Sequence, residues 1–149
     1  MQDQEQTKND FALLSIPTRG PRKRLVRYIL ARLEADMSGK PCDPETDPGT
    51  IEHILPENPD SAWEDDFPVG RQDAAVNRIG NLTLLEAGLN REVANASYGE
   101  KVEAYRRSGY ALSRDIPDVA PEEWTQARLD ARQRRLAARA AHIWRADFA

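Results

Sequence analysis

The sequence contains one cysteine and two histidines, and it lacks a long apolar run. Cys42 alone permits no internal disulfide, and these three residues are too few for the tetrahedral ligand set of a structural zinc site. No apolar stretch approaches the roughly 18 residues that a membrane span needs. The first ten residues, MQDQEQTKND, lack the basic-then-apolar order of a signal peptide. These absences predict a cytoplasmic protein without a membrane partner.

The length and composition of the chain predict one globular domain. Its 149 residues are 40% hydrophobic and 31% charged, which is typical of a folded rather than a disordered chain. Three Trp, four Tyr and three Phe are available to anchor a core. We expect residues 1–18 to form a polar tail or linker and residues 19–149 to form the domain.

The net charge of −4 is distributed unevenly along the chain. Six basic residues and no acid lie between Arg19 and Arg32, and six Arg with one Asp lie between Arg128 and Arg145. The segment 34–66 between these runs carries eleven acids and one Lys. Two basic helices could flank a DNA backbone, whereas the alternative for either run is an ordinary solvated helix face.

The spacing of apolar residues predicts a mainly helical α+β domain. Leu25, Ile29 and Leu33 recur at the helical spacing, and short β-branched or apolar runs predict two strands. The expected elements are helices at 21–36, 86–108 (interrupted near 97–99) and 122–146, and strands at 50–55 and 79–85. Two short strands cannot form a stable sheet alone, so the helices must support them.

Polar residues of three kinds accompany the predicted strands: the pair Glu52–His53, then Asn81, then Asn90. Carboxylate and amide oxygens suit Mg²⁺, which takes few protein ligands and leaves room for phosphate. A histidine with a pKa of about 6.5 can accept a proton from water at neutral pH. A divalent cation with an adjacent base is the minimum for hydrolysing a phosphodiester.

Each of these residues also has a structural interpretation. Neighbouring residues on a strand point to opposite faces, so Glu52 and His53 would flank a metal from different sides or lie at a strand end. Asn81 after Gly80 is typical of a turn. Asn90 is typical of a helix N-cap, an assignment that is compatible with binding a metal at the helix start.

Longer strings around these residues resemble a known family. The runs IEHILPENPDSAW, RIGNLTLLEAGLN and EKVEAYRRS, with a late IW, resemble the C-terminal domain of GmrSD-like and SspE-like modification-dependent restriction endonucleases. The resemblance covers roughly residues 22–146 and implies a ββα-metal (HNH) core, with a short two-stranded hairpin embedded in helices. The paired CxxC zinc knuckles of many HNH proteins are absent here, so helix packing would have to stabilise the core.

The resemblance also implies site residues. His53 would be the general base, Glu52 and Asn90 would be the metal ligands, and Asn81 would orient the loop and His53 as part of the catalytic group. Further expectations concern three DNA-contacting residues and one supporting residue, namely Lys101, Arg91, Arg78 and Asn95.

The implied activity is metal-dependent DNA cleavage, with nicking of one strand as one form of it. The domain would use Mg²⁺ or Mn²⁺ and act as the effector of a restriction or phage-defence system. Its partners would be modified or foreign DNA and an N-terminal NTPase-like sensor domain of a parent protein, from which the chain is excised or stands alone. The alternatives are a non-catalytic DNA- or partner-binding module that keeps the HNH-like shape and a nuclease acting on RNA.

Overall fold

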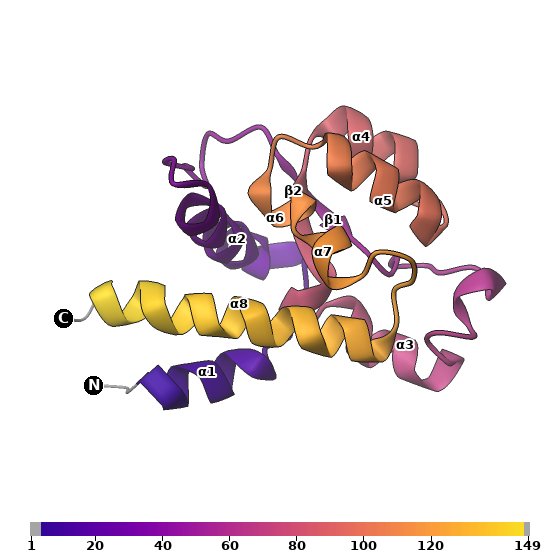
Figure 1. Cartoon of the computed structure of the whole chain (residues 1–149), viewed down its shortest axis with the longest axis horizontal. Helices are drawn as coiled ribbons and strands as arrows, with labels where there is room; N and C mark the ends of the chain where they lie inside the picture. The colour runs from indigo at the N-terminus through magenta and orange to yellow at the C-terminus, as the bar shows by residue number, and fades with distance from the viewer. Residues whose placement is uncertain (1–3, 148–149) are drawn as a thin grey trace.

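Helices surround one short antiparallel sheet in the computed structural model, which describes residues 4–147 (Figure 1). The predicted mainly helical α+β class is confirmed. The helices are α1 (Gln4–Ala12), α2 (Lys23–Ser38), α3 (Val69–Val76), α4 (Ala87–Val93), α5 (Tyr98–Arg107), α6 (Ala111–Arg114), α7 (Ile116–Val119) and α8 (Gln126–Asp147). Short 3-10 turns are η1 (Gly20–Arg22), η2 (Ser61–Trp63) and η3 (Ile79–Asn81). None of the described helices combines the length and apolar composition that crossing a bilayer requires.

The sheet consists of β1 (Thr50–His53) and β2 (Leu82–Leu85), which pair antiparallel with His53 opposite Leu82. Both predicted strands exist, but residues 54–81 join them through η2, α3 and η3 instead of a tight turn. The expected strand at 79–81 is instead the turn η3. A Cβ placed on Gly80 would lie only 2.8 Å from the Cβ of Gln133. The absence of a side chain at Gly80 therefore allows this turn to pack closely against α8.

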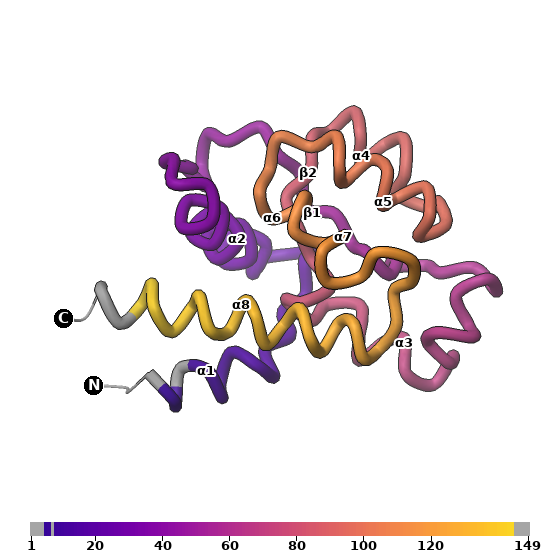
Figure 2. Tube along the Cα trace, viewed as in Figure 1, coloured from indigo at the N-terminus to yellow at the C-terminus, as the bar shows by residue number. Residues whose placement is uncertain are grey.

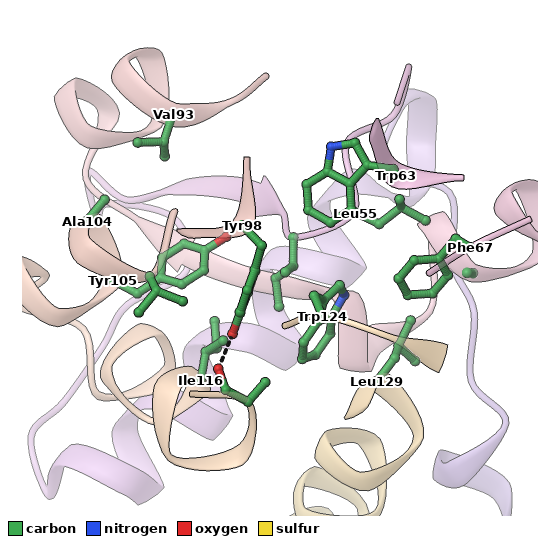
Figure 3. Packing of buried hydrophobic residues seen from close by; sticks show 14 of the residues in the cluster. Leu55, Trp63, Phe67, Val93, Tyr98, Ala104, Tyr105, Ile116, Trp124 and Leu129 are labelled. Carbon is green, nitrogen blue, oxygen red and sulfur yellow. Dashed lines mark hydrogen bonds between the residues drawn. The ribbon is translucent and has the colours of Figure 1, made fainter. Parts of the chain in front are cut away.

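One core cluster lies between the sheet, α5 and the start of α8 (Figure 3). Trp63 and Phe67 are both buried in it, as the availability of aromatic residues for a core predicts. The Tyr98 and Trp124 rings stack with centroids 6.0 Å apart, and the Tyr98 hydroxyl donates a hydrogen bond of 2.6 Å to the Ala120 carbonyl. This cluster fixes α5 against the sheet, which matters for the site described below.

A second core cluster joins α1, α2, β2 and α8. The expected polar tail covers residues 1–18, of which residues 1–3 lie outside the described part; within residues 4–18 the structure differs from a tail, because α1 lies alongside α8 (Figures 1 and 2). Phe11 and Ile16 are buried, and the Gln133 side chain donates to the carbonyls of Phe11 and Leu14 at 3.0 and 2.9 Å. Sequence inspection misses this packing because the segment is mostly polar, and only a few of its residues are apolar and pack against α8.

Most predicted helix boundaries are close to those observed. The helix α2 ends at Gly39, whose φ of 72° is the left-handed conformation typical of a helix stop. The predicted interruption near 97–99 is confirmed, because Ser97 caps α5 and accepts a hydrogen bond from the Glu100 amide. The sequence interpretation missed α3, α6 and α7. The first turn of α6 is capped from a distance by Glu34, whose carboxylate accepts the Ala111 and Leu112 amides.

Candidate functional site

A polar pocket of about 180 Å³ lies at the end of β1, and we call it the site pocket. It combines side chains from β1, the segment that follows it, and the region of α4. Its polar lining consists of Glu52, His53, Glu57, Asn58, Asn90 and Asn95. The predicted acid, histidine and second asparagine therefore meet at one place, with His53 as the last residue of its strand.

Two side chains of α5 donate hydrogen bonds to the Glu52 carboxylate. Lys101 Nζ donates to Glu52 Oε2 at 2.9 Å, and the Tyr105 hydroxyl donates to the same oxygen at 2.6 Å. Lys101 and Tyr105 are four positions apart, so one helix face presents both donors. Lys101 Nζ also donates to the His53 carbonyl at 2.8 Å. This face of α5 thus fixes both the carboxylate and the end of β1.

Burial dominates the electrostatics of this group. Glu52 and Lys101 have side-chain exposures of 2% and 0%, and removal from water raises the pKa of Glu52 and lowers the pKa of Lys101. The ion pair opposes both shifts. Burial, with the adjacent Glu52 charge second, also holds the pKa of Tyr105 well above its usual range, so its hydroxyl remains a donor.

The imidazole of His53 lies between two partners. Its Nε2 is 3.3 Å from Thr18 Oγ1, and its Nδ1 is 3.9 Å from Glu57 Oε1. Burial lowers the pKa of His53, while the Glu57 carboxylate and the Asn77 side chain counteract part of that shift. The ring is therefore favoured in the neutral form at pH 7.

Asn81 is fully buried and fastens the segment that leaves β1. Its Oδ1 accepts the Leu55 amide at 2.8 Å and the Trp124 indole N–H at 3.0 Å. Its Nδ2 donates to the carbonyls of Leu55 and Val76 at 3.1 and 2.9 Å. The side chain is therefore committed to holding the loop, which corresponds to the orienting part of its expected function.

Asn90 lies inside α4, so its interpretation as an N-cap is wrong; the cap position is Glu86. The Asn90 Nδ2 donates to Thr50 Oγ1 at 2.9 Å and to the Ile51 carbonyl at 3.2 Å. Both contacts bind α4 to β1. Because both N–H bonds of the amide are used, the direction of Oδ1 is also fixed.

A family model now adds to this geometry. The model for the C-terminal domain of GmrSD restriction endonucleases matches residues 1–139. The chain belongs to this family. The family is one of restriction-endonuclease-type nuclease domains, whose substrate class is DNA. The match includes α1, which lies outside the extent of 22–146 expected from sequence resemblance. No curated protein matches the chain.

The remaining residues expected in this GmrSD-family domain occupy different environments. Asn95 lines the site pocket, whereas Arg91 is exposed on α4 and is not one of the lining residues. Arg78 forms an ion pair with Asp130 and donates to the Ala12 carbonyl, so it joins α1 to α8. Lys101 is buried in an ion pair with Glu52. Its ammonium group would have to leave that ion pair before it could contact a phosphate.

Sequence interpretation missed three residues that complete the site. Tyr105 follows Lys101 by one helical turn, which is a usable signal once Lys101 is placed on a helix. Glu57 is an acid four positions after His53. That spacing suggests a contact when the segment is a helix, and Pro56 argues against a helix here. Thr18 approaches His53 from a segment 35 positions earlier, and no local pattern announces such a contact.

The oxygens in the site pocket fit a hard divalent cation. Among residues 4–147 no cluster of three or more His, Cys, Asp and Glu could hold a metal ion. Mg²⁺ commonly needs only one or two protein carboxylates, together with water and substrate phosphate. Lys101 and Tyr105 both bind Oε2 of Glu52, and Asn90 is tethered through its nitrogen. One carboxylate and one amide oxygen are therefore the protein oxygens that could hold such a cation.

Proposed function

We propose that this domain is an HNH-type, metal-dependent endonuclease that hydrolyses DNA phosphodiester bonds in the site pocket. The observation that carries the proposal is the convergence of Glu52, His53 and Asn90 on one small pocket. A base, a carboxylate and an amide in one place are the groups that this reaction needs. The family membership supports DNA as the substrate.

His53 acts as the general base. If Nε2 carries the ring proton and donates to Thr18 Oγ1, then Nδ1 has the free lone pair. The 3.9 Å between Nδ1 and Glu57 Oε1 is too long for a hydrogen bond, so the carboxylate does not occupy that lone pair. Nδ1 takes a proton from water, the water oxygen bonds to phosphorus, and one P–O ester bond breaks. A lowered pKa keeps His53 ready to accept that proton at pH 7.

Glu52 and Asn90 hold the cation, which we expect to be Mg²⁺ or Mn²⁺. When bound, such a cation supplies stabilisation of the negative charge on the phosphate and on the departing oxygen. Lys101 and Tyr105 act through Glu52, because their bonds to Oε2 restrict how the carboxylate can rotate. Asn81 is likewise a positioning residue, since it fixes the chain that follows His53.

The test is cleavage of supercoiled plasmid DNA and modified phage DNA, with Mg²⁺ or Mn²⁺ and with EDTA. His53→Ala should lower the cleavage rate by about 10²- to 10⁴-fold, the usual contribution of a general base. His142→Ala is the matched control, because His142 is the other histidine of the chain and is exposed on α8.

Equal rates for His53→Ala and the wild type, or cleavage that survives EDTA, would contradict the proposal. DNA binding by a folded wild-type protein that cuts none of these substrates would favour the non-catalytic module. Selection of modified or foreign DNA would belong to the N-terminal sensor domain that the sequence resemblance implies, and it is tested by fusing the two.

A further inference from the structure

The first basic run of the chain lies at the edge of the site pocket. Thr18 contacts His53, and the next residue, Arg19, forms an ion pair of 3.1 Å with Glu57, which lines the pocket. The chain then continues through η1 into the first turn of α2. We call Arg19, Arg22, Lys23 and Arg24 the basic strip.

The charges of the basic strip face solvent. All four residues are exposed, and neither Arg22 nor Lys23 forms an ion pair within the described part of the chain. Arg19 and Arg24 pair with Glu57 and Glu45, and their own side chains are 80% and 82% exposed. Exposed pairs of this kind contribute little stability, so a phosphate can replace either acid at little cost.

The second basic run lies on α8, and only part of it is exposed in the way the basic strip is. Arg132 is buried and donates to the carbonyls of Gly80 and Leu82, both at 2.8 Å. Arg135 and Arg139 pair with Asp115 and Asp36. No residue of α8 lines the site pocket. Of the two runs, only the first includes a residue, Arg19, that pairs with an acid lining the pocket.

We propose that the basic strip binds the DNA backbone beside the bond that is cut. The proposal rests on the proposed nuclease function and names the surface along which its substrate lies. Consecutive Cα atoms are about 3.8 Å apart, so Arg22 and Lys23 lie within about 11 and 15 Å of Arg19 along the chain. A strand of DNA advances about 3.4 Å per nucleotide, which places the contacted phosphates within a few nucleotides of the pocket.

The distribution of charge along the chain indicates that DNA binds at the basic strip and not over the whole protein surface. The whole chain has a net charge of −4, whereas residues 19–33 contain no acid. The net negative charge of the chain disfavours a polyanion in general, whereas a run of exposed basic residues attracts it locally. Phosphate contacts position the duplex without reading its sequence.

The experiment measures DNA affinity as a function of salt. The His53→Ala protein prevents cleavage, and fluorescence anisotropy of a labelled duplex gives the association constant at several NaCl concentrations. Adding Arg22→Gln and Lys23→Gln should make the negative slope of log K against log salt shallower by about 1.8, because each phosphate contact contributes about −0.9. Arg134→Gln is the matched control, since Arg134 is an exposed arginine of α8, and it should leave the slope unchanged.

Each outcome decides the proposal. An unchanged slope in the Arg22→Gln, Lys23→Gln protein overturns it, while the nuclease function survives if His53→Ala still abolishes cleavage. Loss of affinity for polyglutamate without loss for DNA also overturns it and assigns the strip to an acidic protein partner. If the wild-type protein neither binds nor cleaves DNA, both the proposed role of the basic strip and the proposed nuclease function are wrong. Circular dichroism confirms that the variants fold, as expected for exposed residues.

Discussion

Two polar pockets of this molecule contain buried acids, and they differ in what those acids bind. The second pocket, of about 470 Å³, includes Glu34, Asp47 and Glu86 in its lining. Each of its carboxylates accepts hydrogen bonds from backbone amides: Glu34 accepts two amides of α6, and Asp47 and Glu86 accept the amides of Gly49 and Gly109. They hold turns in place, and no histidine lines this pocket.

The smaller site pocket differs in the groups that surround its acid. Its buried acid, Glu52, is bound by side chains of a remote helix, and a neutral base and a tethered amide lie beside it. Neither the volume of a pocket nor the number of acids that line it is therefore enough to identify a candidate nuclease site. What distinguishes it is the meeting of groups with different chemistry from separate elements. Changes in the site pocket should therefore affect cleavage, and changes in the second pocket should affect stability alone.

The largest loss of stability is expected from Lys101→Met. This change leaves the buried Glu52 carboxylate without its cation, which costs about 3–5 kcal/mol of unfolding free energy. Adding Glu52→Gln removes the unpaired charge and should restore much of that stability while cleavage stays lost. Urea denaturation and plasmid cleavage measure the two effects. Full cleavage by the double variant would show that Glu52 is not part of the nuclease site, and full cleavage by Lys101→Met alone would show that Lys101 does not position it.

Glu34→Ala should give the next largest effect, in the second pocket. It leaves the Ala111 and Leu112 amides of α6 without their acceptor, and an unsatisfied buried donor costs about 1–3 kcal/mol. The unfolding free energy should fall by that amount, and the cleavage rate at temperatures below the melting transition should not change. A cleavage defect in a folded Glu34→Ala protein would erase the distinction between the two pockets.

Tyr105→Phe should separate positioning from stability within the site pocket. It removes one hydrogen bond to a charged oxygen, a loss of about 1.5 kcal/mol, while the ion pair with Lys101 remains. We expect a lower kcat with KM for DNA little changed, because Tyr105 acts on Glu52 and not on the substrate. A variant that loses stability but keeps kcat would assign Tyr105 to the core alone.

The smallest effect is expected from Glu86→Gln, and it depends on pH. Burial alone would raise the pKa of Glu86, but hydrogen bonds from the Gly109 amide and the Ser108 hydroxyl outweigh burial and lower it. A lowered carboxylate pKa stabilises the fold above the unfolded value near 4.5, and this contribution is lost as the pH falls through the folded value. Melting temperatures of the two proteins should therefore differ at pH 7 and converge below pH 4. A constant difference would contradict this origin.

The parts of the site that the sequence predicts are those with local or chemical signatures. Glu52 and His53 are adjacent on a short strand, and Asn81 and Asn90 follow in a recognisable string, so their meeting could be expected. The break at Ser97 was visible because a serine followed three positions later by Glu100 is a capping signal.

The parts that the sequence does not predict depend on contacts between distant segments. Lys101 and Glu52 are 49 positions apart, and nothing in either segment shows that the lysine is buried. Glu34 caps α6 across 77 positions, so a segment that reads as a proline-containing loop becomes helical. The packing of α1 on α8 is likewise a tertiary effect, because the free segment is too polar and too short to be helical alone.

The most direct test of the account is a crystal structure soaked with Mn²⁺ and measured at a wavelength where manganese scatters anomalously. The account predicts one strong peak in the site pocket, bound by oxygens of Glu52 and Asn90 at about 2.0–2.3 Å, with His53 nearby and not ligating. A peak confined to the second pocket, among Glu34, Asp47 and Glu86, would contradict it. So would a site pocket without manganese in crystals whose protein cuts DNA.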